Sequence, residues 1–126
     1  MAITKTKIAA ITYAATNAAA GSTKGTPGVS SGWKDLTGAY AADLSWRIVN
    51  GASAPGIAPT LTIQVSPDSG ATFYDYYTVG GDTAANSDNS GTIAIDPGIQ
   101  YARVIGFGNT TNAVGIGADF SALTAL

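Results

Sequence analysis

Hydrophobic and polar residues alternate in several short stretches of this chain, which is the pattern of β-strands with one buried face. The alternation is clearest in LTIQV, residues 61–65, and recurs at three other places. The apolar positions are Leu44, Trp46 and Ile48; Leu61, Ile63 and Val65; Ile93 and Ile95; and Val114, Ile116, Ala118 and Phe120. In residues 101–107, Tyr101, Arg103, Ile105 and Phe107 share one face, and Ala102 and Val104 share the other.

Turn-forming residues separate these stretches at roughly the 8–12-residue spacing of sandwich proteins. Pro67-Asp68-Ser69-Gly70 predicts a tight connection, so residues 61–66 and 72–79 are expected to pair as a hairpin that buries Phe73 and Tyr77. A short strand is also expected at residues 33–36. The chain is therefore predicted to be all-β, as an antiparallel β-sandwich of immunoglobulin-like or jelly-roll type.

The sequence Asp96-Pro97-Gly98, followed by Tyr101, predicts the corner around which the sandwich is organised. Proline presets φ and glycine tolerates the left-handed region. A tyrosine that opens the next strand often forms a tyrosine corner, in which the phenol bonds to backbone upstream. Trp46 is expected to pack beneath Tyr101.

Residues 1–32 differ from the rest of the chain, because they are rich in Ala, Thr, Ser and Gly and contain few large apolar residues. Helical spacing of Ile8, Ile11, Ala15 and Ala18 is one interpretation. The many β-branched residues of 4–13 favour the other, an extended arm that carries one strand. We prefer the arm, followed by a linker over residues 21–32, with the sandwich domain spanning residues 33–126.

The amino-acid composition excludes several classes of function. Only 11% of the 126 residues are charged and the net charge is −2, which excludes a strongly basic nucleic-acid surface and a polybasic membrane anchor. No apolar run approaches the roughly 20 residues of a membrane span. Residues 1–22 imitate a signal peptide, but Thr12, Thr16 and Asn17 interrupt the apolar part, so we expect synthesis in a cytoplasm.

Catalytic side chains are scarce. The chain has no Cys, no His and no Glu, and its eight carboxylates are all Asp. Without His, the usual general base and the commonest transition-metal ligand are missing. The composition predicts a protein that is not an enzyme and that needs no cofactor.

Three weaker patterns stay open as alternatives. Asp82, Asn86, Asp88 and Asn89 place several oxygen ligands in one loop, which is compatible with calcium or with a solvated loop. Tyr74, Tyr76, Tyr77 and Trp33 are compatible with a sugar platform or with core and interface packing. Asn109-Thr110-Thr111 matches a glycosylation pattern, which has no meaning in a bacterial host.

The order of motifs resembles a group of small virion proteins of tailed bacteriophages. The resemblance rests on an Ala/Thr-rich arm ending in Gly-Ser, DLTGAY (35–40), Asn50-Gly51, VSPDSG (65–70), IDPGIQYARV (95–104) and GNTTNAV (108–114). It extends over nearly the whole chain, although each motif is short. Such proteins are similar to head decoration (cement) proteins or tail-associated components.

This resemblance implies a structural role in the virion after synthesis in the bacterial cytoplasm. The implied partners are the major capsid protein and other copies of the chain, as a homotrimer or homodimer. The arm would dock on neighbours through Ile3, Lys5, Lys7, Ile8, Ile11 and Tyr13, while loops 50–59 and 80–91 would face outward or join copies. The alternative is a tail-associated module that binds a receptor or glycan.

Overall fold

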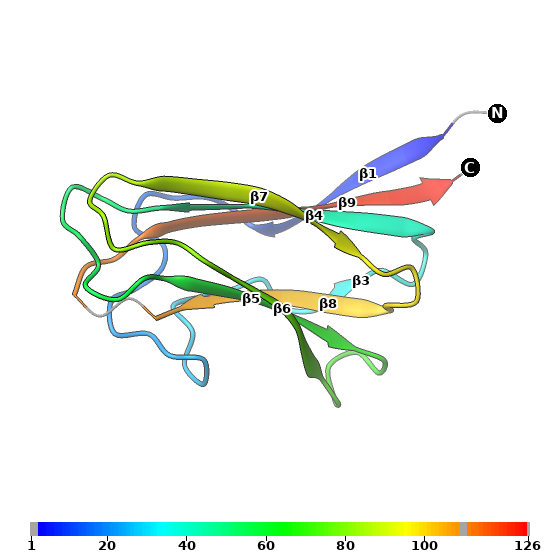
Figure 1. The fold of residues 1–126 in the computed structure, drawn as a ribbon. Coiled ribbons are helices and arrows are strands. Elements are labelled where there is room, and N and C mark those ends of the chain that lie inside the picture. Colours follow the sequence, from blue (N-terminus) through cyan, green and yellow to red (C-terminus); the bar gives the residue numbers. More distant parts are fainter. Residues whose placement is uncertain (1–2, 109–110, 126) are drawn as a thin grey trace.

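Two antiparallel sheets pack face to face in the computed structural model, which describes residues 3–108 and 111–125 (Figure 1). These residues form nine strands and no helix. The strands are β1 (Thr4–Ile11), β2 (Val29–Ser30), β3 (Lys34–Asp35), β4 (Ala41–Val49), β5 (Thr60–Ser66), β6 (Tyr74–Gly80), β7 (Asp88–Ile95), β8 (Tyr101–Phe107) and β9 (Gly115–Ala125). The predicted β-sandwich is confirmed, including the short strand at 34–35.

The strand order identifies the type of sandwich. One sheet has the order β1-β9-β4-β7, and the other has the order β2-β8-β5-β6, with β3 also paired to β8. If β2 and β3 are taken as one interrupted strand, every connection crosses between the sheets except the β5–β6 hairpin. This is the connectivity of a jelly roll, which contains two Greek keys. Of the two sandwich types expected from the sequence, the structure has the second.

The core lies between the sheets and is filled by the apolar positions of the alternating strands. The largest side chains with essentially no exposure in this core include Leu44, Ile48, Leu61, Ile63, Val104, Val114, Ile116 and Phe120. Each residue of this size stabilises the fold by about 1.5–3 kcal/mol when fully buried. The predicted hairpin between residues 61–66 and 72–79 is present as the β5–β6 pair.

The inner face of β8 consists of the small residues and not of the large ones. Ala102 and Val104 are fully buried in the core, whereas Tyr101 lies on the outer face of its sheet, opposite Ser66. Trp46 belongs to the other sheet and lies over Gly91, where an added Cβ would be 3.0 Å from the indole. The expected packing of Trp46 beneath Tyr101 is therefore wrong, because Trp46 packs against the core whereas Tyr101 is on the face of its sheet that points away from the core.

The turn before β8 is confirmed, but a different tyrosine secures it. The Ile99 N–H donates to Asp96 O at 3.1 Å, so Pro97 and Gly98 occupy the middle of a four-residue turn. The Tyr76 hydroxyl donates to Ala94 O and accepts from the Asp96 N–H, both at 3.3 Å. The phenol-to-backbone bond expected of Tyr101 is thus made by Tyr76, from the neighbouring sheet.

The N-terminal segment is part of the sandwich, which corrects the expected boundary at residue 32. Strand β1 pairs with β9 along its length, Ile11 is buried in the core, and Ile8 packs against it. Residues 28–31 then hydrogen-bond along β8. The composition of 1–32 was misleading because strand pairing uses the backbone, so a segment poor in large residues can still belong to a sheet.

Strand β6 forms an edge of the five-stranded sheet and carries exposed aromatic residues. Phe73 and Tyr77 are 47% and 52% exposed, so the prediction that they are buried is wrong. A register shift between Ile63 and Gln64 changes the pairing with β6 at Tyr76. Because such a bulge shifts the alternation by one residue, the faces of this strand do not follow from its sequence.

Candidate functional site

The two ends of the sandwich differ. The start of β1 and the end of β9 lie together at one end, where both termini emerge (Figure 1). The loops that follow β4 and β6 lie at the opposite end (Figure 1). They are joined by hydrogen bonds from Asn50 N to Ser87 O at 2.9 Å and from Asn86 N to Gly51 O at 2.8 Å.

At the terminal end, strand β1 leaves one edge of its sheet unpaired within the described residues, because it is the last strand in the order. Ile3 is 65% exposed, although it is a large apolar residue. A recess of about 320 Å³ lies beside it, lined by Ile3, Lys5, Ala41, Ala42, Asp43, Ser121 and Leu123. The recess extends over β9 and β4, on the paired side of β1. The free strand edge on the other side of β1 is suited to binding an extended segment of a partner.

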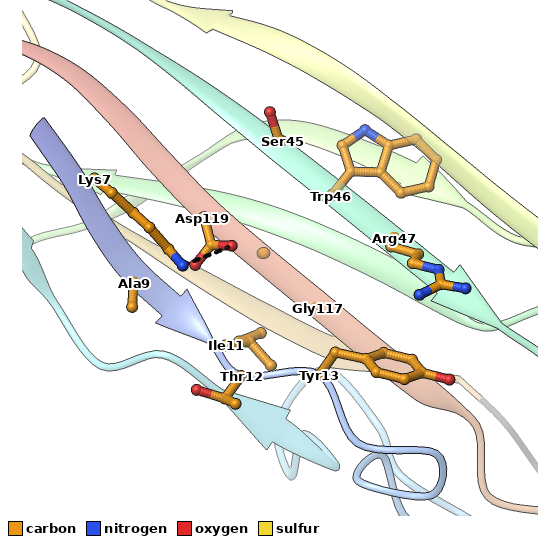
Figure 2. A pocket seen from close by; sticks show the side chains of 11 residues that line it. Lys7, Ala9, Ile11, Thr12, Tyr13, Ser45, Trp46, Arg47, Gly117 and Asp119 are labelled. Atoms are coloured by element: carbon orange, nitrogen blue, oxygen red, sulfur yellow. Dashed lines mark ion pairs between the residues drawn. The ribbon is translucent and has the colours of Figure 1, made fainter. Parts of the chain in front are cut away.

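The outer face of the four-stranded sheet contains a larger depression, of about 420 Å³ (Figure 2). It is lined by residues of three strands and of the segment after β1. These are Lys7, Ala9 and Ile11 of β1, Thr12 and Tyr13, Ser45, Trp46 and Arg47 of β4, and Gly117, Ala118 and Asp119 of β9. The strands bring these residues together in register: Asp119 is opposite Ala9 on one side and opposite Ser45 on the other. Gly117 has no side chain to fill the space.

Tyr13 borders the depression at one end and is held firmly. Its side chain lies over Gly115 and Gly117, where added Cβ atoms would come within 2.6 and 3.0 Å of it. The Asn17 side chain fixes the same segment, because its amide donates to Ile116 O at 2.7 Å and accepts from the Ile116 N–H at 2.8 Å. The glycines of β9 thus provide the space that the Tyr13 side chain occupies.

Arg47 lies beside this tyrosine in a fixed orientation. Its guanidinium carbon is 4.8 Å from the centre of the Tyr13 ring. Its Nε and Nη2 donate to the two carboxylate oxygens of Asp88 at 3.1 and 2.9 Å. This bidentate pair lowers the pKa of Asp88, because the guanidinium donates to the charged form.

Lys7 and Asp119 lie at the other end of the depression, with nitrogen and oxygen 3.9 Å apart (Figure 2). The side chains are 72% and 44% exposed, so this is a loose surface pair with free hydrogen-bonding capacity. Ser45 shares a 3.3 Å hydrogen bond with Thr92 on β7. The depression therefore offers both donors and acceptors, and the charges of its lining residues Lys7, Arg47 and Asp119 sum to zero together with that of Asp88, the partner of Arg47.

The loop considered for calcium is organised by hydrogen bonds to Asp82. Its carboxylate accepts from Ser87 Oγ at 2.6 Å, from the Ala84 N–H at 2.9 Å and from Asn89 Nδ2 at 3.2 Å. These bonds lower the pKa of Asp82. Among the described residues, no group of three His, Cys, Asp or Glu side chains is close enough to hold a metal ion. The carboxylate serves as an acceptor that shapes the loop.

The aromatic residues considered for sugar binding have different environments. Tyr74 and Tyr77 are exposed on β6, whereas Tyr76 packs against the core. Trp33 covers the Arg103 guanidinium, with 4.8 Å between the guanidinium carbon and the ring centre. Phe73 covers the same guanidinium at 4.7 Å. The four residues do not form one platform, because Tyr76 packs against the core and Trp33 lies over Arg103.

The residues expected to dock on partners divide into two groups. Ile3, Lys5, Lys7 and Tyr13 are exposed, whereas Ile8 and Ile11 pack into the molecule's own core. Sequence reasoning missed Arg47 and Asp119 as surface residues of one site. Their signal was the alternation itself, because polar positions between buried ones share the outer face of a strand.

Comparison with known proteins finds no matching family model and no matching curated protein. Solved structures do match. The K1 and K3 cleaved adhesin domains of Lys-gingipain from Porphyromonas gingivalis W83 share 11% and 9% identity with this chain, at TM-scores of 0.51 and 0.52. A structure of infectious bursal disease virus, Gx strain, shares 14% identity at a TM-score of 0.51.

The matches cover most of this chain but less of the other proteins. The adhesin matches cover 76% and 74% of this chain and 62% and 61% of theirs, and the viral match covers 99% of this chain and 34% of its own. The chain thus spans about three fifths of each adhesin domain. At this identity the likeness shows the fold alone: a β-sandwich that occurs in a virus and in bacterial adhesin domains. No described helix is long and apolar enough to cross a membrane.

Proposed function

We propose that this chain is a structural protein of a tailed-bacteriophage virion, a decoration (cement) protein that binds the assembled capsid shell and stabilises it. The observation that carries the proposal is the free edge of β1 at the end of the sandwich where the termini emerge, next to the exposed Ile3. The motif order described above supplies the bacteriophage context. No catalytic step and no cofactor is part of this role.

Strand addition is the binding mode that fits this edge. An extended segment of the major capsid protein, or of a neighbouring copy, adds to β1 by main-chain hydrogen bonds. Lys5 and Lys7 place positive charge on the strand, which disfavours pairing of two β1 edges and favours a partner with acidic side chains.

Stabilisation of the shell then follows from mass action. A protein that binds the assembled lattice and not its free subunits shifts the equilibrium toward assembly. Copies that meet on a symmetry axis of the lattice would form a homotrimer or homodimer. The loops at the opposite end are residues 50–59 and 81–87, the latter being the part of the expected loop 80–91 that lies between β6 and β7 (Figure 1). In this role they would face outward or join copies.

A pair of matched variants tests the docking end. Ile3→Asp places a charge beside the β1 edge, whereas Ile57→Asp makes the same change at the opposite end, on a residue that is 54% exposed. Purified protein is added to phage particles that lack it, and binding is measured by co-sedimentation. Ile3→Asp is expected to bind at least about tenfold more weakly, equivalent to 1.4 kcal/mol, and Ile57→Asp as well as wild type. Wild-type binding by Ile3→Asp would exclude the β1 edge as the docking surface.

The second candidate is a tail-associated module that binds a receptor or glycan, and it is favoured by the exposed Phe73, Tyr74 and Tyr77. Copy number separates the two functions. Quantitative mass spectrometry of purified virions should find the chain in amounts comparable with the major capsid protein if it decorates the shell. A much smaller amount would support the tail location, and absence from virions would exclude both.

A further inference from the structure

We propose that the depression on the outer face of the four-stranded sheet binds a short neutral saccharide. The site lies on the face of the sheet and shares Lys7 with the strand whose free edge is the proposed docking surface, but it uses side chains and not the main-chain groups of that edge. The inference does not depend on where in a virion the chain resides. Its volume of about 420 Å³ falls within the range of about 300–1,000 Å³ that is usual for small-molecule sites.

The lining determines the chemical class of the ligand. An apolar ligand would remove water from Lys7, Asp119 and Arg47 without giving them new partners, which is unfavourable. A small anion would approach Asp119 as well as the two cations, and the local charge sums to zero. A sugar avoids both penalties, because each hydroxyl both donates and accepts a hydrogen bond and the molecule carries no charge.

The placement of donors and acceptors fits vicinal hydroxyl groups. At one end, Asp119 offers acceptor oxygens and Lys7 offers donors across a loose 3.9 Å pair. Ser45 adds a hydroxyl from the adjacent strand (Figure 2). Because Asp119 and Ser45 are opposite each other in the β4–β9 register, their side chains emerge side by side from the sheet.

The apolar part of a sugar has a counterpart at the other end. Tyr13 is 39% exposed and forms a wall beside the floor at Gly117. Because Tyr13 lies against the glycines of β9 and Arg47 is fixed by Asp88, this wall is ordered before any ligand arrives. Preorganisation of this kind lowers the entropic cost of binding.

Titration with defined sugars, followed by ¹H–¹⁵N NMR of the full chain, tests the proposal. The probes are maltotetraose, cellotetraose, mannotetraose and chitotetraose. At least one is expected to shift the backbone amides of residues 7–13, 45–47 and 117–119 with a Kd of about 1 mM, which corresponds to −4.1 kcal/mol. No shift at these amides with any probe at about 20 mM would overturn the proposal, and so would shifts confined to β6.

Matched variants then assign the binding groups. Asp119→Ala is expected to weaken binding at least about tenfold. Asp43→Ala removes a carboxylate from the same outer face of the sheet, on β4 and outside the depression, and should leave sugar binding unchanged. Ser45→Ala is a second, milder variant should Asp119→Ala fail to fold. If Asp119→Ala, Ser45→Ala and Asp43→Ala all bind the sugar equally well, the proposed sugar site is wrong. Both Asp119→Ala and Ser45→Ala should still bind particles, so failure of the sugar site and failure of the decoration role give different results.

Discussion

The outer faces of the two sheets are built in opposite ways. On the five-stranded sheet the outward positions are buried: Ile105 is 2% exposed, and Thr62, Gln64 and Ser66 are 1–3% exposed. On the four-stranded sheet the corresponding positions Asp43, Ser45 and Arg47 are exposed. One face is therefore covered by the chain itself, and the other is open.

The cover of the five-stranded sheet is the segment between β1 and β3. Ser22 O accepts from the Gly108 N–H beside β8, and Lys24 forms an ion pair with Asp75 on β6, so residues 22–28 cross the outer face between these strands. A series of side-chain hydrogen bonds across the sheet orients Asp75, the partner of Lys24 in the cover. Arg103 donates to Gln64 at 2.7 Å, and Gln64 donates to Asp75 at 3.0 Å.

This difference decides which side chains serve the fold and which are accessible to a binding partner. Charged and aromatic side chains on the covered face form hydrogen bonds and stacked pairs within the molecule. On the open face, similar side chains line a depression. The kind of residue is alike on both faces, so solvent access decides which group is free to bind a partner.

The largest effect is expected from Ile105→Ala. Removing this buried side chain from beneath the cover should lower the free energy of unfolding by about 2–5 kcal/mol, measured by urea denaturation. Leu123→Ala, on the open face, should lower it by less than about 1 kcal/mol, because Leu123 is only partly buried. Similar losses for the two variants would contradict the distinction between covered and open faces.

A smaller effect is expected from Trp33→Ala, which removes one of the two rings that enclose the Arg103 guanidinium. The loss should be about 1 kcal/mol, because the cation–π contact is only partly buried and Phe73, the second ring over the guanidinium, is 47% exposed. Hydrogen exchange should increase at the Gly28 and Ser31 amides, which bond to β8. Tyr13→Ala is the control on the open face, and equal exchange in both variants would show that Trp33 does not hold the cover.

The smallest effect is expected from acidification. The pKa of Asp75 lies below its usual value of 3.8, because Lys24 and then Gln64 donate hydrogen bonds to its charged form. This contribution to stability is complete above pH 3.8 and is lost as the pH falls through the lowered pKa of the folded state. NMR should therefore detect loosening of residues 22–28 below pH 3.8. Asp75→Asn should be loosened at every pH and lack this transition, so an acid transition that persists in the variant would assign it to another group.

Local sequence determined the strands. Alternation placed β4, β5, β9 and the second half of β7, and turn residues placed the β5–β6 hairpin and the corner at Pro97, because side-chain period and turn chemistry are properties of a few neighbouring residues. Residues 88–91 were expected in the loop 80–91 but belong to β7, where they pair with β4. The same alternation gave two faces for every strand. It identified Leu61, Ile63 and Phe120 as interior without any knowledge of strand order.

Tertiary structure decided the rest. Which face of β8 points inward depends on what the opposite sheet offers, so Ala102 and Val104 are inside and Tyr101 outside. Residues 4–11 form an edge strand because their backbone pairs with β9, which is far away in the sequence. The depression joins residues of β1, β4 and β9, which only long-range strand pairing brings side by side.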